Sequence, residues 1–129
     1  MTTKDYTHVA DANVHAKRVK WLALGNGDDG TPIGGGPVTG KSVSLDHYQD
    51  RCVQVLGTFG SGGSVSIEGS NDGGTTWVIL TDPLGNALTF TSAGMKQITE
   101  LPHKLRPHVT AGDGTTALDV WLHMRGAER

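Results

Sequence analysis

Residues 64–80 read Ser64-Val65-Ser66-Ile67-Glu68-Gly69-Ser70-Asn71-Asp72-Gly73-Gly74-Thr75-Thr76-Trp77-Val78-Ile79-Leu80 and carry the clearest structural signal in the sequence. The first five residues alternate polar and apolar side chains, which is the period of a half-buried β-strand. Residues 75–80 form a second, apolar strand candidate. The Asn-Asp-Gly-Gly turn between them predicts a hairpin, because glycine accepts the positive φ values that a tight turn requires.

Strand candidates continue on both sides of this hairpin. They cover residues 14–24, 38–45, 51–59, 87–91, 96–101, 105–110 and 117–124, of which 38–45 is the weakest. The total is about eight or nine short strands separated by turns, with no convincing helix. Such a chain must bury one face of each strand, so we predict an all-β fold: an antiparallel two-sheet sandwich of jelly-roll type.

The last two candidates, residues 105–110 and 117–124, are predicted to pair as a hairpin across residues 111–116. Pro107 has no N–H to donate to a ladder. We therefore expect its strand to lie at a sheet edge or to carry a bulge.

The composition fits one turn-rich domain. The 129 residues include 19 glycines, about twice the ordinary share of ~7%, and these lack the three-residue period of collagen. We assign residues 14–129 to a single β-sandwich domain. Residues 1–13 are polar and aperiodic, so we expect an extended N-terminal arm that need not pack on the domain.

Charge and cysteine content exclude several classes of protein. A net charge of −2 gives no long-range attraction for nucleic acid, and no stretch is long and apolar enough to span a membrane. The first residues lack the apolar core of a signal peptide, so we expect synthesis in a cytoplasm. Cys52 is the single cysteine, which excludes an intramolecular disulfide and a cysteine-based zinc site. The apolar run around Cys52 predicts a small buried side chain.

Residues 25–37 predict a long glycine-rich loop, and long loops in compact domains are often functional. The stretch from Gly35 to Ser42 matches the phosphate-binding pattern Gly-x-x-x-x-Gly-Lys-Ser. That pattern binds phosphate between a buried strand and a helix, whereas here an alternating strand candidate follows. Residues 26–30 resemble the start of a calcium loop but lack its later glutamate. We predict neither nucleotide nor calcium binding.

Catalytic groups do not converge in the sequence. The six histidines show no metal-binding spacing, and no nucleophile has a recognisable base. His103, His108 and His123 are the set that folding could still bring together. We predict that the chain is not an enzyme and has no cofactor and no metal site.

The turn after residue 69 fits the pattern Ser-x-Asp-x-Gly-x-Thr-Trp, formed by Ser70, Asp72, Gly74, Thr76 and Trp77. This pattern resembles the Asp box of sialidases and related β-propellers, where it is a structural hairpin remote from catalysis. A single copy in a chain of this length cannot build a propeller. We therefore expect Asp72 and Thr76 to tie the turn and Trp77 to pack beneath it.

Residues 117–124 carry the clearest surface signal. Leu118, Val120, Leu122 and Met124 share one face, which we assign to the core, so Asp119, Trp121 and His123 share the other. Tryptophan is unusual on the polar face of a strand and is enriched in protein contacts. Trp121 therefore marks either a partner surface or a place covered by a loop or arm of the same chain.

Two segments carry a resemblance to a known family: Gly63-Ser64-Val65-Ser66-Ile67-Glu68-Gly69-Ser70-Asn71-Asp72-Gly73-Gly74-Thr75-Thr76-Trp77 and Leu105-Arg106-Pro107-His108-Val109-Thr110-Ala111-Gly112-Asp113-Gly114-Thr115-Thr116. Together with residues 14–33 they resemble the small β proteins of tailed bacteriophages, in particular the jelly-roll capsid decoration (cementing) proteins. The resemblance covers about two-thirds of the chain through turn-and-strand motifs. It implies a virion structural protein that self-associates and binds the major capsid protein on the capsid exterior. We expect a homo-oligomer, with a dimer favoured and a trimer as the alternative.

A decoration protein stabilises the shell by bridging capsid subunits, and arms and loops are the segments that reach across such seams. We expect contacts from the arm (Tyr6 and His8), from the loop (Asp28, Asp29, Pro32 and Ile33) and from the last strand (Trp121 and His123). A phage tail or baseplate component fits the same features. A carbohydrate-binding module is a further alternative, although Trp21, Trp77 and Trp121 are nearly its only candidate platform residues.

Overall fold

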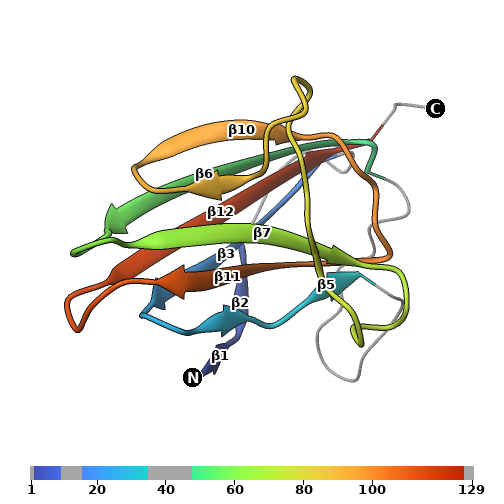
Figure 1. Cartoon of the computed structure of the whole chain (residues 1–129). Helices are drawn as coiled ribbons and strands as arrows, with labels where there is room; N and C mark the ends of the chain where they lie inside the picture. Colours follow the sequence, from blue (N-terminus) through green and yellow to red (C-terminus); the bar gives the residue numbers. More distant parts are fainter. Residues whose placement is uncertain (1, 10–15, 35–47, 127–129) are drawn as a thin grey trace.

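The chain folds into two β-sheets that pack face to face (Figure 1). The computed structural model describes residues 2–9, 16–34 and 48–126, and every regular element in these ranges is a β-strand. The predicted all-β, two-sheet fold is confirmed, and the jelly-roll topology stays a prediction. The strand candidate at 38–45, the stretch from Gly35 to Ser42 and arm residues 10–13 lie outside the described residues.

The first sheet has seven strands. They are β1 (Thr3–Lys4), β4 (Asp29–Gly30), β5 (Ile33–Gly34), β7 (Ser64–Ser70), β8 (Val78–Ile79), β9 (Thr89–Phe90) and β11 (Lys104–Ala111). The main path runs β1-β4-β11-β7-β8, while β5 also pairs with β11 and β9 with β7. The pairing of β1 with β4 is parallel, which departs from the predicted antiparallel pattern, and the other pairs of this sheet are antiparallel.

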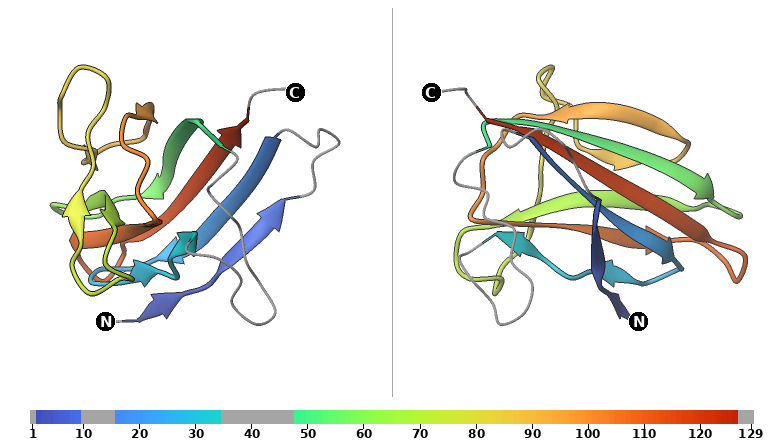
Figure 2. Two further views of the ribbon diagram at one scale, coloured as in Figure 1. Left: turned by 90° about the vertical axis from the view of Figure 1, so that its right-hand side faces the viewer. Right: turned by 180° about the vertical axis from the view of Figure 1, so that it is seen from behind.

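The second sheet has five strands, all antiparallel. Their order is β10 (Gly94–Ile98), β6 (Asp50–Thr58), β12 (Ala117–Arg125), β3 (Ala16–Leu24) and β2 (Tyr6–Val9). The views in Figure 2 show this sheet and the first as two separate layers.

The hydrophobic core fills the space between the two sheets. Alternate residues of each long strand point into it, as the period of a strand requires. The side chains that are at most 1% exposed include Val19, Trp21, Val53, Val55, Leu118, Val120, Leu122 and Met124 from the second sheet, and Ile33, Val65, Ile67, Leu105 and Val109 from the first. Removing this apolar surface from water is the main driving force for folding.

The predicted hairpin of the last two strands is wrong. β11 belongs to the seven-stranded sheet and β12 to the five-stranded sheet, so the turn between them crosses the sandwich. The crossing from β6 to β7 lies beside it: the hydroxyl of Thr116 donates to the carbonyl of Phe59 at 2.8 Å, and the amide of Ser61 donates to Asp113 at 2.8 Å. These bonds join the two crossings at one end of the molecule.

Pro107 lies in a central strand, because β11 has β7 on one side and β4 and β5 on the other. The predicted edge position is wrong, but the predicted bulge is present between Val109 and Ala111. The amide of Val109 donates towards β4, at 2.8 Å from the carbonyl of Asp28, so the nitrogen of Pro107 two residues earlier faces the same side. On that side β11 faces the break between β4 and β5, so the missing N–H of Pro107 removes no hydrogen bond from the ladder.

A bulge interrupts the alternation of β3 opposite residues 118–120. Val19 and Trp21 are buried two residues apart, but the next buried residue is Leu24, and Ala23 is exposed with a φ of 57°. The amide of Ala23 donates to the carboxylate of Asp119 at 3.0 Å, which secures the bulge across the sheet.

Cys52 is less buried than the sequence predicts. It is half-buried on the outer face of the five-stranded sheet, because Arg51, Val53 and Val55 take the inner positions of β6. Desolvation raises the pKa of the Cys52 thiol.

The N-terminal segment is part of the sandwich rather than a separate arm. Residues 3–4 pair with β4 in the seven-stranded sheet, and residues 6–9 pair with β3 in the five-stranded sheet. Tyr6 holds this segment against the domain. Its side chain is 3% exposed and packs edge-on against Trp21, with the ring centres 6.2 Å apart. Tyr6 thus anchors this largely polar segment in the core.

The predicted loop at residues 25–37 is also partly sheet. β4 and β5 lie within it and pair with β11, and Asp28, Asp29 and Ile33 are buried. Glycine at position 30 allows the backbone of β4 to lie this close to the core. A Cβ at this position would lie 2.6 Å from the indole of Trp21 and 2.7 Å from the ring of Pro107.

Candidate functional site

The outer face of the five-stranded sheet carries Trp121, and we call its outward side chains the Trp121 face. Leu118, Val120, Leu122 and Met124 are buried on the inner side of β12, at most 1% exposed. Trp121 is therefore placed outward, as the sequence predicts, and is half-buried.

Trp121 lies at the centre of a row that crosses the sheet. Its paired residues are Lys20 on β3 and Gln54 on β6, and the row continues to Thr7 on β2 and Met95 on β10. The ammonium of Lys20 lies 4.9 Å from the centre of the Trp121 ring, which is a cation–π contact. Met95 is 59% exposed at the end of the row, so the row combines apolar surface with positive charge.

A second row lies beside the first. His123 on β12 pairs with Arg18 on β3 and with Cys52 on β6, which pairs in turn with Gln97 on β10. His123 is exposed. Because Lys20 lies against the Trp121 ring, this part of the face favours an acidic, partly apolar partner surface.

The predicted contact residues fall into two groups. His8 and His123 are exposed, and Pro32 and Trp121 are half-buried, so these four reach the surface. Tyr6, Asp28, Asp29 and Ile33 are at most 8% exposed and serve the chain's own fold, which corrects their assignment as contact residues. Burial, with a smaller contribution from Asp5, raises the pKa of Tyr6.

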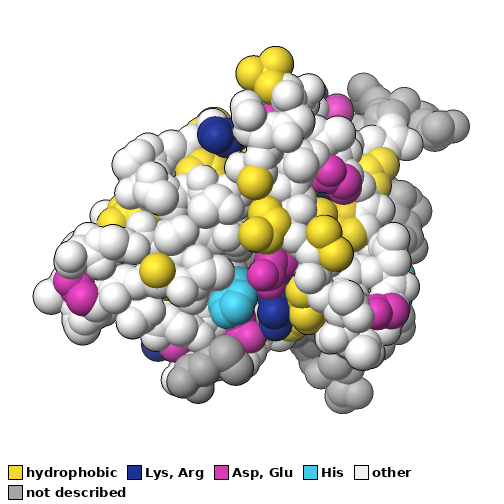
Figure 3. Space-filling model, in the orientation of Figure 1, with side chains coloured by type: hydrophobic (Ala, Val, Ile, Leu, Met, Phe, Trp, Pro, Cys, Tyr) yellow, Lys and Arg dark blue, Asp and Glu magenta, His cyan; other side chains and the backbone are white. Residues whose placement is uncertain are grey.

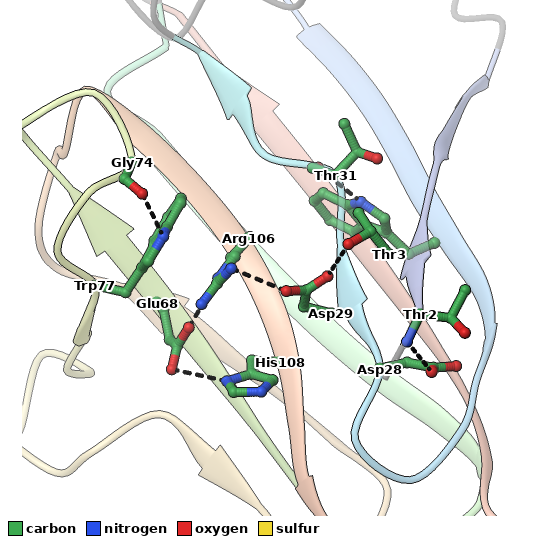
Figure 4. A network of polar contacts seen from close by, with 11 residues as sticks. Thr2, Thr3, Asp28, Asp29, Thr31, Glu68, Gly74, Trp77, Arg106 and His108 are labelled. Carbon is green, nitrogen blue, oxygen red and sulfur yellow. Dashed lines mark hydrogen bonds and ion pairs between the residues drawn. The ribbon is translucent and has the colours of Figure 1, made fainter.

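Asp29 belongs to a polar network on the outer side of the seven-stranded sheet (Figure 4). The guanidinium of Arg106 bridges two carboxylates, with Nη1 at 3.0 Å from Asp29 and Nε at 2.9 Å from Glu68. The second oxygen of Glu68 lies 3.2 Å from Nδ1 of His108, and the hydroxyl of Thr3 donates to Asp29 at 2.6 Å. The network connects β1, β4, β11 and β7, so its evident role is to fix the order of these strands.

The turn between β7 and β8 is tied by Asp72, whose Oδ1 accepts hydrogen bonds from the hydroxyl of Ser70 and the amides of Thr75 and Thr76 at 2.7–3.1 Å. The indole of Trp77 donates to the carbonyl of Gly74 at 3.1 Å. The guanidinium of Arg106 stacks 4.2 Å from the centre of the Trp77 ring, which joins the turn to the polar network. All five residues of the predicted turn motif thus lie in one structural unit.

Asp113 ties the crossing between β11 and β12 in a related way. Its carboxylate accepts from the amide and hydroxyl of Thr115 and from the amide of Ser61. The pKa of Asp113 is lowered from 3.8 to about 2 by the hydrogen bonds from Thr115 and Ser61. The pKa of Asp72 is lowered to about 2 by those from Thr76 and Ser70.

These two lowered pKa values predict a specific acid sensitivity. The unfolded chain binds protons at the two carboxylates more readily than the folded chain, so their stabilising contribution is complete above about pH 4 and is lost towards about pH 2. We expect urea unfolding measured between about pH 5 and about pH 2 to show a smaller loss of stability for Asp72→Asn/Asp113→Asn than for the wild type. Equal losses in the two proteins would contradict the assignment.

The structure reveals a groove at the end of the seven-stranded sheet that sequence reasoning missed, and we call it the Ile79 groove. It encloses about 510 Å³, and its exposed apolar walls are Val78, Ile79 and Leu101, which are 63%, 42% and 55% exposed. Figure 3 shows hydrophobic side chains gathered on the face of the molecule that carries this sheet. The run Val78-Ile79-Leu80, in which apolar residues do not alternate with polar ones, was its only signal in the sequence.

The three tryptophans lie in three different places. Trp21 is in the core, where its indole donates to the carbonyl of Thr31 at 3.1 Å; Trp77 flanks the seven-stranded sheet; and Trp121 lies on the five-stranded sheet. They do not form the coplanar platform expected of a carbohydrate-binding module. His103, His108 and His123 are likewise apart, on the loop before β11, on β11 and on β12.

Within the described ranges, no group of three or more His, Cys, Asp or Glu side chains could hold a metal ion. No helix in the same ranges is long and apolar enough to cross a membrane. Comparison with protein-family models, with curated proteins and with solved structures finds no match to this chain.

Proposed function

We propose that this chain is a non-catalytic structural protein that binds other protein surfaces through the Trp121 face. The observation that carries the proposal is the half-buried Trp121 at the centre of the outward side of the five-stranded sheet, flanked by Lys20. A tryptophan held on a sheet is a common binding hot spot, and the positive charge beside it adds electrostatic complementarity to an acidic partner.

The specific function we propose is decoration of a tailed-phage capsid. The chain would bind the major capsid protein on the outside of the shell and bridge neighbouring subunits after synthesis in the host cytoplasm. What supports this is the sequence resemblance together with a two-layer β-sandwich that carries Trp121 and Lys20 on one outer face. A protein that binds only the assembled shell stabilises it by mass action, and symmetry repeats each contact many times.

Further parts of the proposal are the jelly-roll topology and self-association, as a dimer in preference to a trimer. A tail or baseplate component is the alternative that the same surface would serve. Mass spectrometry of purified virions distinguishes the two, because decoration requires a copy number that matches the capsid subunit. A copy number far below that of the capsid subunit would place the chain in the tail, and its absence from virions would reject both functions.

Replacing Trp121 by alanine tests the contact surface. We expect Trp121→Ala to fold normally, because the inner face of β12 is unchanged, and to weaken capsid binding by about 30-fold, the effect of losing ~2 kcal/mol at a contact hot spot. The measurement is co-sedimentation with capsids stripped of the protein. His103→Ala, an exposed position outside the Trp121 face, is the control. Retained binding by Trp121→Ala would reject this face as the contact.

A further inference from the structure

Leu84 is the most exposed large hydrophobic residue in the described part of the chain, at 88%. It projects from the tight turn between Thr81 and Ala87, which we call the Leu84 turn and which these two residues close as a β-bridge. Figure 3 shows a hydrophobic group projecting from the top of the molecule, where the turn after β8 lies in Figure 1. An aliphatic side chain that projects in this way can serve as the anchor that fills a pocket on another molecule.

The Leu84 turn is rigid, because Asp82 ties it from several directions. The Asp82 carboxylate accepts hydrogen bonds from the amides of Leu84 and Asn86, both at 2.9 Å. The amide of Asp82 donates to the carbonyl of Asn86, and the amide of Gly85 donates to the carbonyl of Asp82, again at 2.9 Å. The backbone of the turn is thus fixed before binding, so little backbone freedom is lost when Leu84 is buried.

The Ile79 groove on the same chain is an apolar hollow of about 510 Å³. Its floor is formed by the buried residues Gly69, Leu80 and Pro102, which pack so closely that a Cβ on Gly69 would lie 2.7 Å from the ring of Pro102. β8 forms one wall and is the last strand of the main sheet path, with β7 on its other side. Leu84 cannot be seated in the groove of its own chain, because it is almost fully exposed.

Charge around the two features is also complementary. Lys96 lies at the base of the Leu84 turn, 3.8 Å from Asp82, and its side chain is 41% exposed. Asp72 and Glu100 line the groove. Glu100 accepts hydrogen bonds from the amide and hydroxyl of Thr81. Asp72 and Glu100 thus place two carboxylates beside the apolar wall of the groove. Lys96 is ion-paired with Asp82, but its side chain is partly exposed and the Asp82 carboxylate is buried, so the base of the turn presents a cation suited to a groove bordered by carboxylates.

We propose that the Leu84 turn of one copy of this chain inserts into the Ile79 groove of a second copy, and that the exchange is reciprocal and forms a two-fold dimer. The chain supplies both halves of the contact, and four of the six exposed large hydrophobic residues in the described ranges belong to it: Val78, Ile79, Leu84 and Leu101. The contact uses neither Trp121 nor its row, so it is independent of the proposed capsid binding.

The test is the oligomeric state of the purified chain in a concentration series, measured by sedimentation velocity. We expect the wild type to dimerise, and Leu84→Asp and Ile79→Lys each to raise the dimer dissociation constant by about 100-fold or more, because the two-fold dimer of either variant loses two buried leucine-sized contacts, each worth about tenfold. A mixture of the two variants is expected to dimerise more tightly than either alone. The mixed pair retains one intact contact and places opposite charges in the other.

The control is Met95→Asp, which adds the same charge at an exposed apolar residue on the other sheet and should leave the dimer unchanged. Circular dichroism and thermal unfolding establish that each variant is folded, and Leu84→Ser replaces Leu84→Asp if that variant is not. A wild type that stays monomeric at every concentration overturns the proposal. Dimerisation that is lost in Met95→Asp but kept in Leu84→Asp also overturns it. A mixture of Leu84→Asp and Ile79→Lys that dimerises no more tightly than either variant alone overturns it as well.

Discussion

Replacing Arg106 by alanine is expected to lower the free energy of unfolding by about 3 kcal/mol, the lower end of the range for removing one partner of a buried ion pair. The guanidinium contacts Asp29 and Glu68, whose side chains are only 7% and 11% exposed. Without Arg106, two carboxylates remain close together with little access to water. The stacking of Arg106 on Trp77 is lost as well.

The measurement is urea unfolding at neutral pH, compared with two further variants. Arg106→Lys keeps the charge but cannot bridge both carboxylates with a planar fork, so we expect a smaller loss. The triple variant Arg106→Met/Asp29→Asn/Glu68→Gln removes all three charges and is expected to recover part of the stability, because no uncompensated charge is left. If Arg106→Ala unfolds at the same urea concentration as the wild type, the network does not hold the strands together.

Replacing Trp21 by alanine is expected to cost about 3–5 kcal/mol, the usual range for truncating a large aromatic residue in a core. Trp21 is 0% exposed, packs against Tyr6 and donates its indole N–H to the carbonyl of Thr31. Its removal leaves a cavity between the sheets and an unpaired carbonyl in the segment between β4 and β5.

Trp21→Phe separates these two effects. It keeps most of the apolar contact and loses the hydrogen bond, so we expect a smaller loss than for alanine, of about 1–3 kcal/mol. Thermal and urea unfolding of both variants provide the measurement. A loss of less than about 1 kcal/mol for Trp21→Ala would mean that the surrounding side chains collapse into the space.

The sequence predicts the sandwich because its long strands obey a simple local rule. Residues 64–68 and 117–124 alternate without interruption, and the side chains assigned to the core from that alternation are buried. The outward placement of Trp121 follows from the same rule. Each of these predictions depends on neighbours in the sequence, where periodicity is informative.

Sheet membership could not be predicted in this way, because it depends on long-range pairing. β11 and β12 follow one another in the chain, and adjacent strands often pair, yet here they belong to different sheets. The short strands β1, β4 and β5 have two residues each, too few for a period to be visible. They form because β11 and Trp21 provide a surface on which they can pack.

The contact surfaces were only partly predictable for a related reason. Polar, glycine-rich segments suggest exposure, but Asp28 and Asp29 are buried because Thr2, Thr3 and Arg106 satisfy their carboxylates. Those partners are separated from them by at least 26 residues in sequence. The Ile79 groove likewise combines residues 69–80 with residues 100–102, which no local pattern connects.

The position of β12 has a consequence for how the protein is made. β12 lies in the middle of the five-stranded sheet, between β6 and β3, although it is the last strand in the chain order. While the ribosome has synthesised the chain only as far as β11, β3 and β6 lack the strand that joins them. The five-stranded layer can therefore assemble only after residues 117–125 have been synthesised, and until then the apolar inner faces of β3 and β6 lack their central partner strand.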